Sequence, residues 1–304
     1  MFKNKDYSFL SKLLHHLALG NKYIPEFLHD IELMTFKKKI EINDLKPHIF
    51  VCGLPRSGST ILMKALYETN EFASLTYRDM PFVVLPNIWS KISNKIKANK
   101  LKERIHEDNI SINIDSPEAL EEVFWKTKLQ KKYILLNKLI SHEVDEFTIN
   151  EFKNYISLIL LKYKKQLYLS KNNNNILRIE SIIKTFPNSL ILIPYRDPLQ
   201  QTRSLLTQHQ RFNHEQKRNK FIKQYMTYLA HHEFGLDHKP YYFNINDKLT
   251  SDTHSIDYWL EQWTEVYTYL SQKKFQTNLH KDIETQQDYP DHAFLLLIQQ
   301  EILN

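Results

Sequence analysis

The segment that decides the fold is Ile49-Phe-Val-Cys-Gly-Leu-Pro-Arg-Ser-Gly-Ser-Thr60, which joins an apolar stretch to a loop rich in glycine and serine. Gly53 and Gly58 stand where a nucleotide P-loop has its two glycines. Ser59 stands where such a loop carries its lysine, and Arg56 is the strong cation inside the loop. Because that lysine reaches the β- and γ-phosphates, the segment predicts a phosphate-binding loop that is poorly suited to ATP.

Composition is that of an ordinary globular protein. The 304 residues are 42% hydrophobic and 25% charged, which is enough for one large α/β domain and excludes wholesale disorder. The net charge of +6 favours anionic ligands, but no long basic run is interleaved with aromatic residues, so we expect no nucleic-acid partner. Cys52 is the single cysteine; we expect it to be buried, and the lack of disulfides and targeting signals favours a cytoplasmic location.

Strand and helix patterns alternate through the first two thirds of the chain, which predicts a P-loop-type parallel sheet flanked by helices. The expected strands and helices are, in order, His48–Cys52, helix Ser59–Glu68, Ser74–Tyr77, helix Phe147–Tyr163, Leu167–Ser170, helix Ile176–Phe186 and Leu190–Tyr195. Residues 172–175 are expected to form a loop. We expect one domain over 1–304, with leading helices in 1–47, a nucleotide-binding core in 48–206 interrupted by an insertion or lid at about 88–145, and an additional helical region on the acceptor side in 207–304.

An amphipathic helix is expected near the N-terminus, where Leu10, Leu13, Leu14 and Leu17 recur at helical spacing. We expect this apolar stripe to pack on the domain or on a second subunit, as in a homodimer; contact with a membrane surface is the alternative. No stretch approaches the roughly 18 apolar residues that cross a bilayer, so no transmembrane span is expected.

Three further segments carry helix signals. Residues 116–125 are expected to open a capped helix at Ser116. The aromatic residues between Tyr258 and Leu270 form a stripe that we interpret as core. Residues 231–235 combine two histidines with a glutamate, but adjacent helical residues point about 100° apart, so we interpret this segment as a helix end closed by glycine and expect no metal site.

A second phosphate signal follows the last expected strand. Arg196 ends that strand, Asp197 caps the next helix, and Ser204 lies on the same helix face two turns later. An arginine fork with a hydroxyl holds phosphate well, and ligands of α/β sheets lie at this edge. The simpler alternative is that Arg196 only pairs with Asp197 or the helix end. Two phosphate sites on one edge indicate a nucleotide phosphorylated at both ends.

In order and spacing, these motifs resemble those of the sulfotransferase superfamily, in particular its bacterial and Golgi-type branch. Its members use 3′-phosphoadenosine 5′-phosphosulfate as sulfonate donor and release adenosine 3′,5′-bisphosphate. Gly53–Thr60 is similar to the family's 5′-phosphosulfate loop, and Arg196 with Ser204 to its 3′-phosphate site. Lys171 and the segment around Arg178 resemble its middle motif. The resemblance covers about half of the chain.

The resemblance implies roles for the matching residues. Lys171 would neutralise charge on the bridging oxygen as the sulfonate departs, whereas the alternative is an ordinary exposed loop lysine. Arg196 and Ser204 would hold the 3′-phosphate. The 5′-phosphosulfate would be held, through backbone N–H groups, side chains and a helix N-terminus, by Arg56, Ser57, Gly58, Ser59 and Thr60.

The implied reaction also needs a base that removes the proton of the acceptor hydroxyl. Asp79 follows the second expected strand, where the family places a catalytic acidic residue, and is the first candidate. Arg78 would act as its partner toward the acceptor or the sulfonate. Glu107 is the second candidate, with His106 beside it on the acceptor side. The alternative for Asp79 is a capping role in the next turn.

The leading hypothesis is therefore a sulfotransferase that acts on a hydroxyl or amine acceptor by in-line displacement, without a metal. Family analogy favours a carbohydrate or glycolipid as the acceptor, with a protein tyrosine next. A P-loop kinase-like phosphotransferase is one alternative, although Ser59 at the lysine position argues against it. A catalytically inactive nucleotide-binding module is the other.

Overall fold

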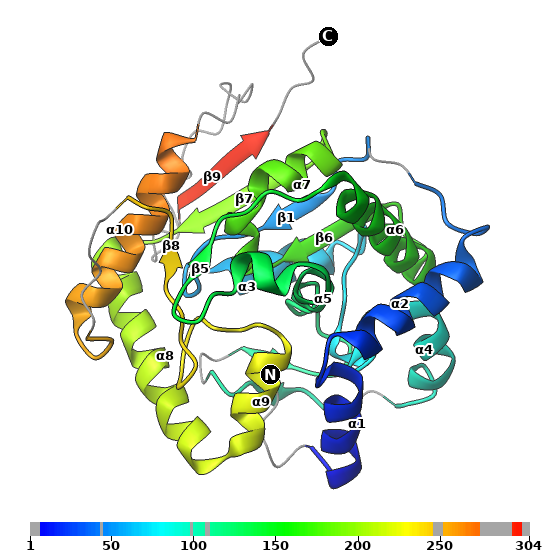
Figure 1. Ribbon diagram of the computed structural model, residues 1–304, viewed down its shortest axis with the longest axis horizontal. Coiled ribbons are helices and arrows are strands. Elements are labelled where there is room, and N and C mark those ends of the chain that lie inside the picture. Colours follow the sequence, from blue (N-terminus) through cyan, green and yellow to red (C-terminus); the bar gives the residue numbers. More distant parts are fainter. Residues whose placement is uncertain are drawn as a thin grey trace.

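The computed structural model describes residues 7–42, 45–97, 100–106, 110–245, 252–273 and 294–299. A five-stranded sheet with the order β2-β6-β1-β7-β9 lies at its centre (Figure 1). β9 runs antiparallel to β7, and the other neighbours are parallel. The strands of this sheet are β1 (Ile49–Val51), β2 (Phe72–Ala73), β6 (Leu167–Lys171), β7 (Leu190–Tyr195) and β9 (Phe294–Gln299). Two small strand pairs are β3 (Lys102–Glu103) with β4 (Ser111–Ile112) and β5 (Leu139–Ile140) with β8 (Tyr241–Tyr242).

Helices surround this sheet, so the predicted α/β class with a parallel sheet is confirmed (Figure 1). The α-helices are α1 (Phe9–Leu19), α2 (Tyr23–Phe36), α3 (Ser59–Glu68), α4 (Pro86–Ser93), α5 (Glu122–Tyr133), α6 (Glu146–Tyr163), α7 (Ile179–Thr185), α8 (Pro198–Arg218), α9 (Lys220–Tyr228) and α10 (Ile256–Gln272). Short 3-10 helices are η2 (Tyr77–Asp79) and η3 (Asn173–Leu177).

Strand β1 is buried on both faces because its side chains alternate between two apolar clusters. Ile49 and Val51 pack with Met63 of α3 on one face. Phe50 and Cys52 face the larger core formed with α5, α6 and α7. Cys52 is fully buried as expected, and burial raises the pKa of its thiol. The alternation fixes the register of the strand and thus the place where the following loop begins.

The second strand and the turn after it differ from the prediction. β2 covers only Phe72–Ala73, whereas Ser74–Tyr77 was expected. The chain turns at Thr76 because the Asp79 carboxylate accepts a hydrogen bond from the Thr76 N–H at 2.8 Å, which closes a capping box around η2. Local side-chain hydrogen bonding therefore ends the strand early.

The predicted insertion at 88–145 is only partly separate from the core. Its helix begins at Glu122 and not at Ser116, because residues 116–118 run alongside the segment 75–77 as an extended pair. Trp125 of α5 is fully buried, with its ring 4.2 Å from that of Phe152. α5 is thus a core helix.

The structure contradicts one expectation for the chain ends and part of another; packing of the α1 stripe on a second subunit stays a prediction. The region after residue 207 is not purely helical, since it also supplies β8 and β9. The apolar stripe of α1 does not pack on the domain: Leu10 and Leu17 are 62% and 51% exposed, and the buried face holds His15 and Ala18 instead. Leu14 is half-buried. Within the described residues, no helix combines the length and apolar character needed to cross a membrane.

Candidate active site

The loop after β1 has the backbone conformation of an anion-binding turn. Arg56 and Gly58 have positive φ angles of 68° and 93°, and Gly58 is the N-cap of α3. Positive φ within such a turn bends successive N–H groups toward one side, where they join the free N–H groups of the helix N-terminus. The predicted helix Ser59–Glu68 is confirmed.

Two observations indicate a free donor and open space at this loop, as an oxyanion would need. The Ser57 hydroxyl is fully buried and has no hydrogen-bond partner among the described residues, which costs stability unless a ligand supplies one. A Cβ built on Gly58 would meet no atom within 4 Å, so the space in front of the loop is open.

Helices α8 and α10 hold the loop in place. The Gln201 side chain donates to the Pro55 carbonyl at 3.0 Å, and its oxygen accepts from the Trp263 indole at 3.1 Å. Tyr267 donates to the carbonyl of Pro194, in β7, at 3.1 Å. The aromatic stripe of α10 is therefore core, as predicted, and it also fixes the geometry of the loop.

The residues of the second predicted phosphate site lie at different distances from the loop. Ser204 accepts a hydrogen bond from Arg56 Nε at 2.9 Å, so α8 and the loop are in direct contact. Arg196 donates to the Gln200 side chain at 3.2 Å, farther out on the first turn of α8. Asp197 caps this helix as predicted, accepting from the Gln200 N–H at 2.9 Å.

Lys171 lies at the carboxyl end of β6, beside the start of the loop. It pairs in register with Val51, and only 9% of its surface is exposed. It is therefore not an ordinary surface lysine. Burial lowers the pKa of its ammonium group, while the carboxylates of Glu118 and Glu233 oppose this shift. A buried cation at this strand end is well placed to meet negative charge on a ligand of the loop.

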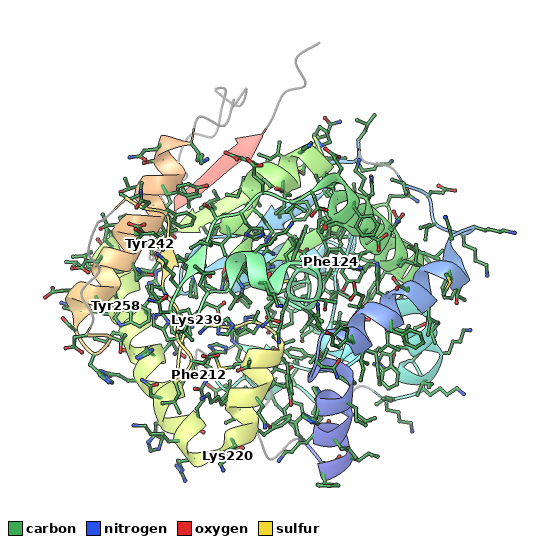
Figure 2. All side chains as sticks on the ribbon, viewed as in Figure 1. Phe124, Phe212, Lys220, Lys239, Tyr242 and Tyr258 are labelled. Atoms are coloured by element: carbon green, nitrogen blue, oxygen red, sulfur yellow. The ribbon has the colours of Figure 1, made fainter. Side chains whose placement is uncertain are left out.

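A cavity joins the loop and Lys171 to residues that the sequence patterns did not single out as a site. Its ionisable lining includes Arg104, Glu118, His231 and Glu233. One wall is apolar and aromatic, and consists of Tyr77, Phe212, Tyr225, Met226, Leu229 and Phe234. From the loop side it is lined by Pro55, Arg56, Ser59 and Thr60. Phe212 projects from α8 in the lower part of the molecule (Figure 2) and stacks on Phe234.

The first predicted base does not reach this cavity. Asp79 is completely buried, forms an ion pair with Lys162 and accepts a hydrogen bond from the Tyr163 hydroxyl at 2.7 Å. Arg78, its proposed partner, is bound to Asp115, with Nε 2.5 Å from the carboxylate. The capping alternative for Asp79 is the correct one, and the sequence could not separate the two because both place an acid after a strand.

The second predicted pair lies partly outside the described residues. Glu107 is outside them, so its role as a base stays a prediction. His106 lines the cavity and packs edge-on against Phe212, with ring centroids 5.1 Å apart. Its main-chain carbonyl accepts from Gln208 and Arg211 of α8. His106 thus lines the cavity, and its role on the acceptor side stays a prediction.

Two carboxylates, those of Glu118 and Glu233, line the cavity. Glu118 accepts a hydrogen bond from the Tyr77 hydroxyl. Burial raises its pKa, and the charges of Lys171 and Arg104 together with the Tyr77 hydrogen bond oppose this shift. For Glu233, burial raises the pKa, but contact with His231 and hydrogen bonds, including the one from Asn173, outweigh burial and lower the pKa to about 2.

His231 and Glu233 form a pair within a loop and do not close a helix. α9 ends at Tyr228, and Ala230, with φ 51°, turns the chain before the histidine. His231 Nδ1 lies 3.4 Å from Glu233 Oε1, and Asn173 donates to the same oxygen at 2.8 Å. The helix-end prediction for 231–235 is wrong. Among the described residues, no group of three or more His, Cys, Asp or Glu side chains is arranged to hold a metal ion.

Comparison with known proteins gives the family. Two sulfotransferase structures resemble the fold: one from Mycobacterium tuberculosis H37Rv (TM-score 0.48, 11% identity, 86% of this chain and 70% of that chain covered) and one from Mycobacterium avium (TM-score 0.42, 14% identity, 90% and 80% covered). None of the curated proteins matches the chain. The model of the Sulfotransferase family matches residues 47–258, which is more than half of the sequence and contains the loop, Lys171 and the cavity. The chain therefore belongs to the sulfotransferase family and is a sulfotransferase enzyme.

Proposed function

We propose that this enzyme transfers a sulfonate from 3′-phosphoadenosine 5′-phosphosulfate to a hydroxyl group of a carbohydrate or glycolipid. The observation that carries the proposal is the cavity in which the loop residues Arg56, Ser59 and Thr60 meet Lys171 and the His231–Glu233 pair. Such a site contains an anion cradle, a cation for the leaving group and a proton acceptor, which are the parts that sulfonate transfer needs.

The donor would bind along the loop and the start of α8. The backbone N–H groups of the loop, Arg56 and the unpartnered Ser57 hydroxyl fit the 5′-phosphosulfate. Ser204 and Arg196 would hold the 3′-phosphate. Because Arg56 already donates to Ser204, we expect this contact to rearrange when the nucleotide binds between them.

Lys171 and Arg56 would act on the leaving group. The donor supplies an activated sulfonate whose bond to the bridging oxygen breaks as the acceptor oxygen bonds to sulfur. The electron pair remains on the bisphosphate, and the buried Lys171 ammonium stabilises that charge more than a solvated lysine would.

His231 replaces Asp79 as the proposed base. Glu233 contacts its Nδ1 and would orient the ring, so that Nε2 accepts the proton of the acceptor hydroxyl. Asn173 holds Glu233 in turn. This arrangement supports a proton acceptor in the same cavity as the loop.

The wall of the cavity supports a sugar as acceptor. Phe212, Tyr225 and Phe234 present aromatic surface, which packs against the apolar face of a sugar ring, while Glu118 and Glu233 offer acceptors for hydroxyl groups.

The test is turnover of donor carrying labelled sulfonate, with lipid-linked sugars, free oligosaccharides and tyrosine peptides as acceptors. We expect label to move to a sugar hydroxyl, and we expect Lys171→Ala to lower kcat by about 10²–10³-fold with little change in bisphosphate affinity. Transfer to tyrosine alone would reject the sugar acceptor. Labelled phosphate transfer from ATP with magnesium, and no sulfonate transfer, would reject the whole proposal.

A further inference from the structure

The exposed face of α1 is apolar along its length. Phe9, Leu10, Leu13 and Leu17 are 84%, 62%, 41% and 51% exposed. They occupy one arc of the helix, opposite the buried His15 and Ala18. Four large apolar side chains in a contiguous stripe are more than the scattered exposed residues of an ordinary surface.

A basic segment borders this stripe. Four exposed cations lie where α8 passes into α9, namely Lys217, Arg218, Lys220 and Lys223. Figure 2 shows Lys220 at the lower edge of the molecule, near the end occupied by α1 in Figure 1. Contacts join the two helices: Lys12 Nζ lies 5.3 Å from the centre of the Phe221 ring, and His16 is hydrogen-bonded to the Tyr228 hydroxyl at 2.8 Å.

Acidic residues are absent from the α1 segment and from the α8–α9 junction. Residues 7–25 and 216–230 contain no Asp or Glu, although acidic residues make up 35 of the 304 positions. Lys12 and Lys22 add further positive charge on and after α1. Positive charge therefore flanks the apolar stripe, and these two segments add no negative charge. This favours a partner that is both anionic and apolar over a second copy of the same basic surface.

We propose that the α1 stripe and the basic α8–α9 junction together form a membrane-docking surface for anionic phospholipids. α1 lies in the interface plane with Leu10, Leu13 and Leu17 among the acyl chains, while Lys220 and Lys223 contact the headgroups. A single amphipathic helix binds weakly by itself, and the added cations supply the second signal that stable peripheral binding needs.

Docking would bring the cavity close to lipid. α9 carries Lys220 and Lys223 on its outer face, and its opposite face supplies Tyr225 and Met226 to the cavity wall. This placement suits a glycolipid acceptor whose headgroup enters the cavity from the membrane, an inference that rests on the proposed function. The docking surface itself does not depend on the reaction.

The test is co-sedimentation of the full chain with vesicles of phosphatidylcholine alone or with added phosphatidylglycerol. We expect binding only to the anionic vesicles, and weakening at high salt because the charges are screened. Lys220→Glu with Lys223→Glu should weaken binding at least 25-fold, at about fivefold for each cation removed. Leu13→Ser with Leu17→Ser should weaken it by a similar factor without unfolding, since both side chains are exposed.

Matched controls use exposed residues elsewhere. Lys91→Glu with Lys95→Glu changes the same charge at the end of α4, and Leu136→Ser removes an apolar side chain that is 94% exposed. Both controls should bind vesicles like the wild type. Any of four results would overturn the proposal. The controls lose binding equally, the wild type does not bind anionic vesicles, or it binds only polyanions such as heparin. The fourth is that the chain binds no vesicles but forms a dimer, which Leu13→Ser with Leu17→Ser dissociates. Bisphosphate binding, measured separately, reports on the donor site and not on this surface.

Discussion

At the scale of single residues, a buried ion pair between Arg178 and Glu122 lies next to the end of strand β6, which carries Lys171. Arg178 donates to Glu122 at 2.8 and 3.0 Å, and neither side chain is more than 1% exposed. Asn172, next to Lys171, donates to the same carboxylate at 2.6 Å. The guanidinium also lies 4.8 Å from the centre of the Trp125 ring. The pair therefore fixes the end of β6, where Lys171 meets the cavity.

Replacing Arg178 with methionine should destabilise the fold strongly. The change leaves Glu122 buried without its cation, which costs about 3–5 kcal/mol. Urea denaturation measures the loss. Lys184→Met is the control, because it breaks a pair with Glu146 in which both side chains are more than 60% exposed, and such pairs contribute little. Equal effects of the two substitutions would contradict this interpretation of Arg178.

The proposed base makes a second prediction at this scale. His231→Ala should lower kcat about 10²–10⁴-fold and leave the bisphosphate Kd within about twofold. Added imidazole should restore part of the activity, which a merely structural histidine would not allow. His214→Asn, an exposed histidine on α8, should behave like the wild type. A loss in His106→Asn instead, or wild-type turnover in His231→Ala, would move the base elsewhere.

At the scale of elements, the loop between β1 and α3 depends on a conformation that one glycine supplies. Gly58 has φ 93°, and a Cβ there would meet no neighbour. A side chain at this position is therefore strained by its backbone and not by crowding.

Gly58→Ala should consequently lose about 1–2 kcal/mol of stability and weaken bisphosphate binding, because the loop must relax or carry a methyl group into the open space. Gly58→Asn should lose less stability, since asparagine adopts left-handed conformations more readily. Thermal denaturation and calorimetry distinguish the two effects. Wild-type stability in Gly58→Ala would show that the loop conformation is not strained by a side chain.

Elements with strong local signals were predictable from the sequence. α3, β7 and the capped start of α8 lie where their patterns place them, because each has its own apolar period or cap. The segments around Asp79, Ser116 and Gly235 were not predictable. Their structure depends on a capping box, on pairing of 116–118 with 75–77, and on a helix that ends before the histidines.

The same limit applies to the candidate site. Arg56, Ser57 and Lys171 follow from one motif and one strand end. Glu118 and Glu233 come from segments more than 100 residues apart, and only the fold brings them into one cavity. The histidine pair with its neighbouring acid was a visible signal, but no residue pattern there favours a cavity loop over a helix end.

At the scale of the whole molecule, buried histidines should make stability depend on pH. Burial lowers the pKa of His48 and His209 to about 4, and that of His142 and His238 to about 3. Between pH 6.5 and 4 the unfolded chain binds protons that the folded chain does not. Stability therefore falls as the pH drops through this range.

The expected slope is about 1.4 kcal/mol per pH unit for each fully neutral buried histidine. Thermal denaturation followed by circular dichroism from pH 7.5 to 5 measures it. His48→Asn should reduce the slope, since its amide oxygen replaces Nδ1 as acceptor for the Tyr168 N–H, now at 3.1 Å, and does not titrate. An unchanged Tm between pH 7.5 and 5 would contradict the neutral buried histidines.

Calorimetric binding of adenosine 3′,5′-bisphosphate, beside ATP with magnesium, tests the donor site most directly. We expect the bisphosphate to bind, and Arg196→Ala to weaken it by about 1.5–3 kcal/mol through loss of a charge-assisted phosphate contact. Arg203→Ala, an exposed arginine on the same helix, should bind like the wild type. No bisphosphate binding, equal loss in both variants, or preference for ATP with magnesium would contradict the proposed donor.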